Sequence, residues 1–111
     1  MDFPERMIAL ERRLLERFGA NGTLAGKTTA YDPETDRQVE VAAPPRTVRM
    51  MVGPIETVDD QGRAVFRMVA KMQDEPKRDE VLSFAGRTYT VGNVITYYEA
   101  DKPVLYVAEV D

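Results

Sequence analysis

The chain has 111 residues and a mass of 12.5 kDa, the size of one compact domain. Apolar residues make up 43% of it and charged residues 31%, a balance typical of globular rather than disordered proteins. The sequence contains no Cys, His or Trp, which excludes disulfides, Cys/His zinc sites, thiol nucleophiles and Ser-His-Asp catalysis. We therefore expect a soluble domain that is not an enzyme, and the lack of Cys favours a reducing compartment.

The net charge of −4 arises entirely in the second half of the chain. Residues 1–50 hold eight bases and eight acids, whereas residues 51–111 hold seven bases and eleven acids. No basic block indicates a nucleic-acid-binding surface. No apolar stretch approaches the roughly 18 residues of a membrane span, and the N-terminus lacks the layout of a signal peptide, so no membrane partner is predicted.

Residues 2–18 are predicted to form an amphipathic helix. Asp2 and Glu5 have the spacing of an N-cap and its reciprocal partner. Gly19 is expected to end the helix in the left-handed conformation, and Asn21-Gly22 is expected to add a turn.

The two sides of this helix differ in character. The apolar side is formed by Met7, Ile8, Leu10, Leu14, Leu15 and Phe18. The opposite side carries four candidate interaction residues, which are Arg6, Arg12, Arg13 and Arg17.

From residue 22 onward the apolar pattern has a period of two, which is typical of strands. We expect a small β-barrel or sandwich over residues 22–110, with the helix covering an open end or an edge, in a single domain of residues 1–111. The predicted strands are 23–31, 38–43, 47–52, 55–58 after a break at Gly53-Pro54, 64–71, 81–84, 88–98 with a bulge at Gly92-Asn93, and 104–110.

Three carboxylates alternate in the predicted turn between the first two strands. Asp32, Glu34 and Asp36 are spaced like the opening of a calcium-binding loop. However, Arg37 stands where such a loop needs Gly, and Ala43 stands where it needs a bidentate Glu. A solvated turn is the preferred interpretation, and no metal or cofactor is predicted.

The segment from Gln73 to Glu80 holds six charges and is expected to form a solvated loop, with docking of a protein partner as the alternative. Its acids lack the pocket that would separate their pKa values, so acid–base catalysis is not predicted. A second polar turn is predicted at residues 59–62. The candidate interaction residues in these two segments are Asp59, Asp60, Asp74, Glu75, Lys77 and Arg78.

Tyrosines concentrate in the last two long strands. Tyr89, Tyr97, Tyr98 and Tyr106 lie there, and Phe84 precedes them. Aromatic side chains on a sheet can stack on single-stranded bases, but such sites need a positive groove, and this half of the chain is acidic. Packing of these rings in the core is the preferred interpretation.

Two segments carry a family resemblance. The first is the strand that begins at Gly22-Thr23-Leu24 and leads into YDPETDRQVE at residues 31–40. The second is KRDEVLSFAGRTYTVGNVITYYEADKPVLYVAEV at residues 77–110, with Asp79, Gly86, Tyr89, Val91, Val94 and the closing strand Val104–Val110. They resemble the opening hairpin and the barrel-closing hairpin of the head–tail joining family of tailed bacteriophages, the neck proteins also called head-closure or stopper proteins.

The resemblance implies a structural virion protein of the neck, which joins head to tail and closes the portal after DNA packaging. Its subunits would form a homo-oligomeric ring, a hexamer or a dodecamer. The portal or portal-adaptor protein would lie above this ring, and a tail-tube or tail-terminator protein below it. DNA would pass through without sequence-specific binding. The chain would be made in the cytoplasm of the bacterial host, for an infectious phage or a gene transfer agent.

Two alternatives remain open. One is another virion β-protein, such as a tail terminator or a tail-tube component, which would share the composition and the strand pattern. The other is a cellular OB- or SH3-like binding module, against which the charge balance argues where nucleic acid is the ligand.

Overall fold

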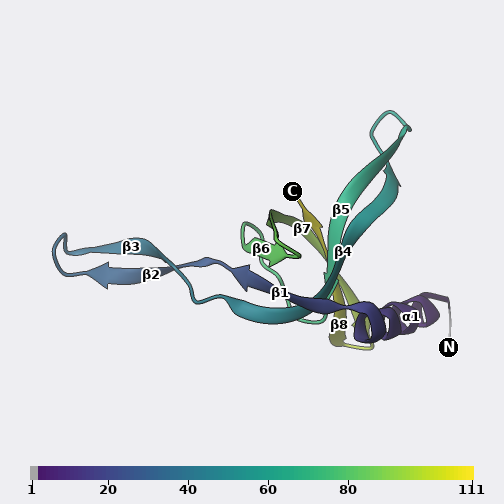
Figure 1. Cartoon of the computed structure of the whole chain (residues 1–111), viewed down its shortest axis with the longest axis horizontal. Coiled ribbons are helices and arrows are strands. Elements are labelled where there is room, and N and C mark those ends of the chain that lie inside the picture. The colour runs from purple at the N-terminus through teal and green to yellow at the C-terminus, as the bar shows by residue number, and fades with distance from the viewer. Residues whose placement is uncertain (1–2) are drawn as a thin grey trace.

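A computed structural model describes residues 3–111, with side chains from Arg6 onward (Figure 1). The chain is mainly β with one N-terminal helix, as the sequence predicts. Asp2 and the side chain of Glu5, the predicted N-cap pair, lie outside the described part. The elements are α1 (Phe3–Phe18), β1 (Ala20–Ala25), β2 (Lys27–Asp32), β3 (Arg37–Ala42), β4 (Arg46–Val58), β5 (Ala64–Met72), β6 (Val81–Phe84), β7 (Arg87–Glu99) and β8 (Lys102–Val110).

Six strands form a ring-like antiparallel sheet around the core. Their order is β1-β4-β5-β8-β7-β6, and β6 pairs back with β1 between Thr23↔Ser83 and Ala25↔Val81. The predicted bulge in β7 is confirmed by the shift in register between Val91 and Val94. The side chains that fill the ring are Leu24, Val48, Met50, Ala70, Met72, Leu82, Val91, Tyr106, Ala108 and Val110.

Two hairpins project from this ring (Figure 1). The first, which we call the β2–β3 arm (residues 27–42), is a two-stranded sheet that pairs with no other strand of the described chain. The second is the β4–β5 arm (residues 54–68). It is the part of the β4–β5 hairpin in which β4 no longer pairs with β1 and β5 no longer pairs with β8. The arms make the molecule elongated, with principal extents of 57 × 34 × 29 Å.

The helix packs on the outer face of the ring, against β4 and β8. Leu15 is the most deeply buried of the helix side chains that the structure describes, at 2% exposure. The prediction that the helix covers an open end or an edge is therefore wrong. No helix in the described part of the chain is long and apolar enough to cross a membrane.

The predicted strand 23–31 is two strands, because the pairing partner changes at Gly26. Up to Ala25 the chain pairs with ring strands, and from Lys27 it pairs with β3 in the arm. Period-two patterning shows that a segment is extended but does not show which strand is its neighbour.

The predicted break at Gly53-Pro54 is wrong, since β4 runs through it without interruption. Pro54 lies opposite Met68 in the arm, where β4 has β5 as its one partner. A strand edge tolerates proline because the missing N–H costs no ladder hydrogen bond on the unpaired side.

The C-terminal end of the helix also differs from the prediction. Gly19 follows the helix as predicted but is not left-handed, and Asn21-Gly22 lies inside β1 instead of in a turn. Gly19 donates its N–H to the Leu15 carbonyl at 2.9 Å. A Cβ at Gly19 would lie 2.4 Å from that carbonyl oxygen, so close approach and not a positive φ explains the glycine.

Candidate interaction surfaces

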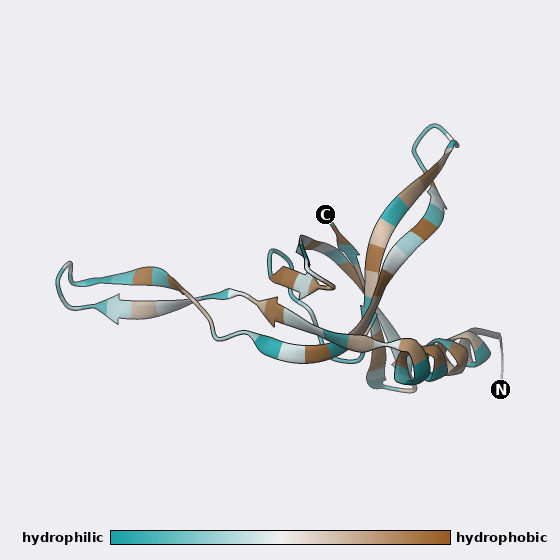
Figure 2. Cartoon of the chain, viewed as in Figure 1, coloured by the Kyte–Doolittle hydropathy of each residue, from teal (hydrophilic) through white to brown (hydrophobic). Residues whose placement is uncertain are grey.

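The apolar side of α1 is wider than its contact with the sheet. Leu15 is buried, but Leu10 and Phe18 remain 55% and 63% exposed. Figure 2 shows apolar residues recurring along the helix. The apolar members beside Leu15 that stay exposed or half-buried, which we call the outer helix stripe, are Met7, Leu10, Leu14 and Phe18.

The four predicted interaction residues of the helix have separate roles. Arg12 pairs with Glu99 at 3.2 Å and so ties the helix to the β7–β8 turn. Arg6, Arg13 and Arg17 are exposed and form no ion pair with any residue that the structure describes. The Arg17 guanidinium lies 5.3 Å from the centre of the Phe18 ring, beside the outer helix stripe.

An apolar groove of about 380 Å³ runs between α1 and the sheet. The Lys71 ammonium donates to both carboxylate oxygens of Glu11, at 3.0 and 2.9 Å, so the charges on this groove satisfy each other. A groove lined mostly by apolar side chains is suited to contact with an apolar partner. Its lining consists of Met7, Ile8, Glu11, Ile55, Lys71, Tyr97, Leu105 and Val107.

The β4–β5 arm carries an apolar row that starts in the core. Met50 and Met72 pair inside the ring, and paired residues share one face of a sheet. Every second residue of a strand points to the same face, so Met68, Phe66 and Val58 lie on the same face as this pair. Phe66 is 74% exposed and Val58 is 65% exposed. The row therefore leaves the core and ends in solvent, as the apolar bands on this arm in Figure 2 illustrate.

The tip of this arm is the predicted polar turn, in which Asp59 has a structural role. Its carboxylate accepts hydrogen bonds from the backbone N–H groups of Gln61 and Arg63, both at 2.9 Å, and from the Arg63 side chain at 3.1 Å. The backbone N–H of Arg63 lowers the pKa of Asp59 most, opposed by desolvation and aided by the bond from Gln61. Asp59 thus stabilises its own turn, and Asp60 is the exposed acid of the tip.

The charged segment Gln73–Glu80 is a loop, as predicted, but it is anchored. Arg46 of β4 donates to the Glu75 carbonyl at 2.6 Å and to the Glu80 carboxylate at 2.9 Å. Glu80 also accepts the backbone N–H of Lys77, and Pro76 is buried. The loop is therefore held against the ring rather than fully solvated.

A polar cleft of about 930 Å³ separates this loop from the base of the β2–β3 arm. Glu75, Lys77 and Arg78 line it, whereas Asp74 is exposed outside the lining. The lining holds both bases and acids, so the cleft presents no single-sign charge to an ionic ligand.

The three carboxylates at the tip of the β2–β3 arm form a turn. Asp32 accepts hydrogen bonds from the Glu34 N–H and the Thr35 hydroxyl, both at 3.0 Å. The Tyr31 hydroxyl donates to Asp36, and this bond raises the pKa of Tyr31. No group of three or more metal-binding side chains occurs among the residues that the structure describes.

The aromatic residues divide between core and surface. Tyr106 is in the core at 7% exposure, and burial raises its pKa. Phe84 and Tyr89 pack against the core, as predicted. Tyr97 and Tyr98 are 40% and 57% exposed, so core packing was the wrong interpretation for these two.

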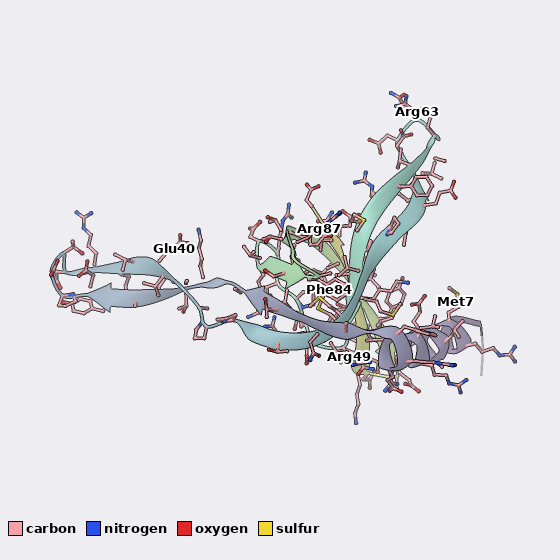
Figure 3. All side chains as sticks on the ribbon, in the orientation of Figure 1. Met7, Glu40, Arg49, Arg63, Phe84 and Arg87 are labelled. Atoms are coloured by element: carbon pink, nitrogen blue, oxygen red, sulfur yellow. The ribbon has the colours of Figure 1, made fainter. Side chains whose placement is uncertain are left out.

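The predicted interaction residues do not form one site. They lie on the helix, at the tip of the β4–β5 arm and in the charged loop. Figure 3 shows the helix, marked by Met7, and the tip of that arm, marked by Arg63, in separate regions. The sequence patterns did not identify Arg46, which binds the charged loop, or Arg49, which binds the end of α1. Each lies far along the chain from the element that it binds. A comparison of the sequence with models of known protein families finds no match, and a comparison with curated proteins finds no significant relative.

Proposed function

We propose that this chain is a structural protein of the neck of a tailed phage or gene transfer particle. It joins the head to the tail and closes the portal after DNA packaging. The observation that supports this most directly is the exposure of large apolar side chains on parts that project from the ring. These are Phe66 and Val58 on the β4–β5 arm, and Leu10 and Phe18 on the helix. Exposed apolar surface of this kind marks contacts between proteins.

A connector subunit needs several separate contact surfaces. It touches two neighbours in its own ring, the portal or portal adaptor above, and the tail tube or tail terminator below. The helix and the two arms, which carry exposed apolar and charged side chains, extend in different directions (Figure 1). This distribution suits a hexameric or dodecameric ring between two larger assemblies better than it suits a protein with one ligand site.

The charge of the chain agrees with passage of DNA through such a ring. The net charge is −4, and bases and acids are interleaved on the loop and the helix. A strongly basic channel would hold the duplex by its phosphates and slow its movement. DNA would therefore pass without sequence-specific binding.

Cryo-electron microscopy of intact particles tests the position of the chain. The proposal predicts a ring of density between portal and tail into which copies of this fold can be placed. If the fold matches the tail tube or the tail end, the chain is another virion β-protein. If purified particles lack the chain, a cellular binding module becomes the better explanation.

A further inference from the structure

The β2–β3 arm lacks the support that a β-sheet ordinarily needs. Its two strands pair with each other from Lys27↔Ala42 to Asp32↔Arg37, and no third strand of the described chain joins them. An isolated two-stranded hairpin is marginally stable in water unless another element covers one of its faces. In Figure 1 the arm extends alone from one end of the molecule.

The two faces of this arm differ in their aliphatic content, and we call the face with more aliphatic side chains the apolar face and the other the polar face. The cross-strand pair Ala30↔Val39 and the neighbouring residue Val41 lie on the same face, because alternate residues of a strand point to opposite sides. Thr28 and, toward the tip, Asp32 and Arg37 share the apolar face. The polar face carries the ion pair of Lys27 with Glu40, at 3.9 Å, together with Thr29, Tyr31, Gln38 and Ala42. This division is the pattern of a hairpin that packs by one face on an apolar partner.

The outer helix stripe offers a matching surface at the other end of the molecule. The arm and α1 lie at opposite ends of the longest axis, whose extent is 57 Å (Figure 1). The six residues of β2 span roughly 20 Å at the rise of a strand. The stripe from Met7 to Phe18 spans roughly 17 Å at the rise of a helix. A helix on a sheet face is a standard packing arrangement.

The charges of the two surfaces are complementary. Arg6, Arg13 and Arg17 are exposed on the helix and pair with no described residue. The arm has four acids and two bases. Asp32, Glu34 and Asp36 lie at its tip, whereas Glu40 pairs with Lys27 on the polar face. Opposite charges around an apolar contact favour its correct orientation and disfavour contact between two like surfaces.

We propose that the apolar face of the β2–β3 arm of one copy packs on the outer helix stripe of the next copy. This specifies the subunit contact of the ring and so rests on the proposed function. The contact joins two different surfaces, so each copy has one free arm and one free stripe with which to continue the assembly. Such head-to-tail contacts close into a ring when the rotation between copies permits it.

Cysteine cross-linking tests this contact cleanly, because the natural chain has no Cys. Chains with Leu10→Cys are mixed with chains carrying Ala30→Cys, and a short bis-maleimide is added to the purified protein at high concentration. One chain carries a mass tag, so that mixed dimers and like dimers separate on a gel. The matched control replaces Ala30→Cys by Thr29→Cys, the adjacent exposed position on the polar face.

The proposal predicts that Leu10→Cys and Ala30→Cys give a mixed dimer at about fivefold or more the yield of Leu10→Cys with Thr29→Cys, because adjacent strand residues face opposite sides. Equal yields in the two mixtures would overturn it. So would a predominance of dimers between two Ala30→Cys chains, which would mean that arms pair with arms. The test uses the purified chain, so its failure leaves the location in the particle to be decided separately.

Discussion

The guanidinium of Arg49 on β4 binds the carbonyl oxygen of Leu15, at 3.2 Å, and also that of Glu16, at 2.9 Å. These carbonyls belong to the last turn of α1, where helix geometry leaves acceptors to be satisfied by groups outside the helix. The Leu15 oxygen also accepts the Gly19 N–H, at 2.9 Å. A cation at this end also interacts favourably with the helix dipole. Arg49 therefore fixes the end of the helix on the sheet and, with it, the direction in which the outer helix stripe faces.

Replacement of Arg49 by Met should lower the free energy of unfolding by about 1–2 kcal/mol, since two hydrogen bonds from a charged donor are lost. Chemical denaturation followed by circular dichroism measures this change. Arg13→Met on the exposed side of the helix is the control and should stay within about 0.5 kcal/mol of the parent. Equal losses in the two variants would contradict this role for Arg49.

The Glu11–Lys71 ion pair should couple more strongly than the Arg12–Glu99 pair. The side chains of the first pair are 26% and 24% exposed, whereas those of the second are 59% for Glu99 and 39% for Arg12. Screening by water weakens exposed ion pairs. Double-mutant cycles should therefore give a coupling free energy of about 1 kcal/mol for the first pair and of less than about 0.5 kcal/mol for the second. The reverse order would mean that Glu11 and Lys71 are not held together in solution.

Gly22→Ala should be strongly destabilising. A Cβ there would lie 2.7 Å from the sulfur of Met50 and 2.8 Å from the carbonyl oxygen of Ser83, inside the ring. Overpacking of this kind costs about 1–3 kcal/mol of unfolding free energy. Gly53→Ala is the matched control, since nothing lies within 4 Å of its Cβ position and its φ is not positive. Thermal denaturation of both variants should separate them clearly.

The titration of Tyr31 should depend on Asp36. The Tyr31 hydroxyl donates to the Asp36 carboxylate, which raises the tyrosine pKa above its ordinary value of 10.0. Any stability from this bond is present below pH 10 and is lost as the pH rises through the raised pKa. Asp36→Asn removes the charge and should move the Tyr31 pKa back down. An NMR titration of the ring carbons measures both values, and no change in the variant would show that the bond is absent in solution.

Local patterns predicted the helix, most strands, most turns and the bulge in β7. They could not predict partners that lie far away in the chain. The change of strand partner at Gly26 creates the β2–β3 arm, and no local pattern accompanies it. The attachment of the charged loop depends on Arg46, which precedes that loop by about thirty residues. Nothing in the sequence around Arg46 distinguishes it from a solvated surface arginine.

The exposed surfaces were hidden from sequence reasoning for a related reason. Phe66 and Met68 alternate in the same row, which the sequence assigns to one face of a strand. Met68 packs against the core, whereas Phe66 lies beyond the point where the neighbouring strands of the ring end and is exposed to solvent. Periodicity therefore finds the face of a strand, but the extent of neighbouring strands decides whether that face is covered.

Phe66→Ser should leave the fold intact and impair assembly. Since the side chain is 74% exposed, the unfolding free energy should change by no more than about 0.5 kcal/mol. Particles produced with this variant should contain fewer joined heads and tails than those of the parent, counted in electron micrographs. Met68→Ser is the contrasting control, because its side chain packs against the core and the variant should lose stability.

Electron microscopy of particles produced after deletion of the gene tests the proposed neck function most directly. A neck function predicts separate tails beside heads that are full or have leaked their DNA, and restoration of joined particles when the gene is supplied again. Joined particles with normal tails would contradict a neck function. Full heads that carry tails of abnormal length would contradict it as well and would assign the chain to the tail.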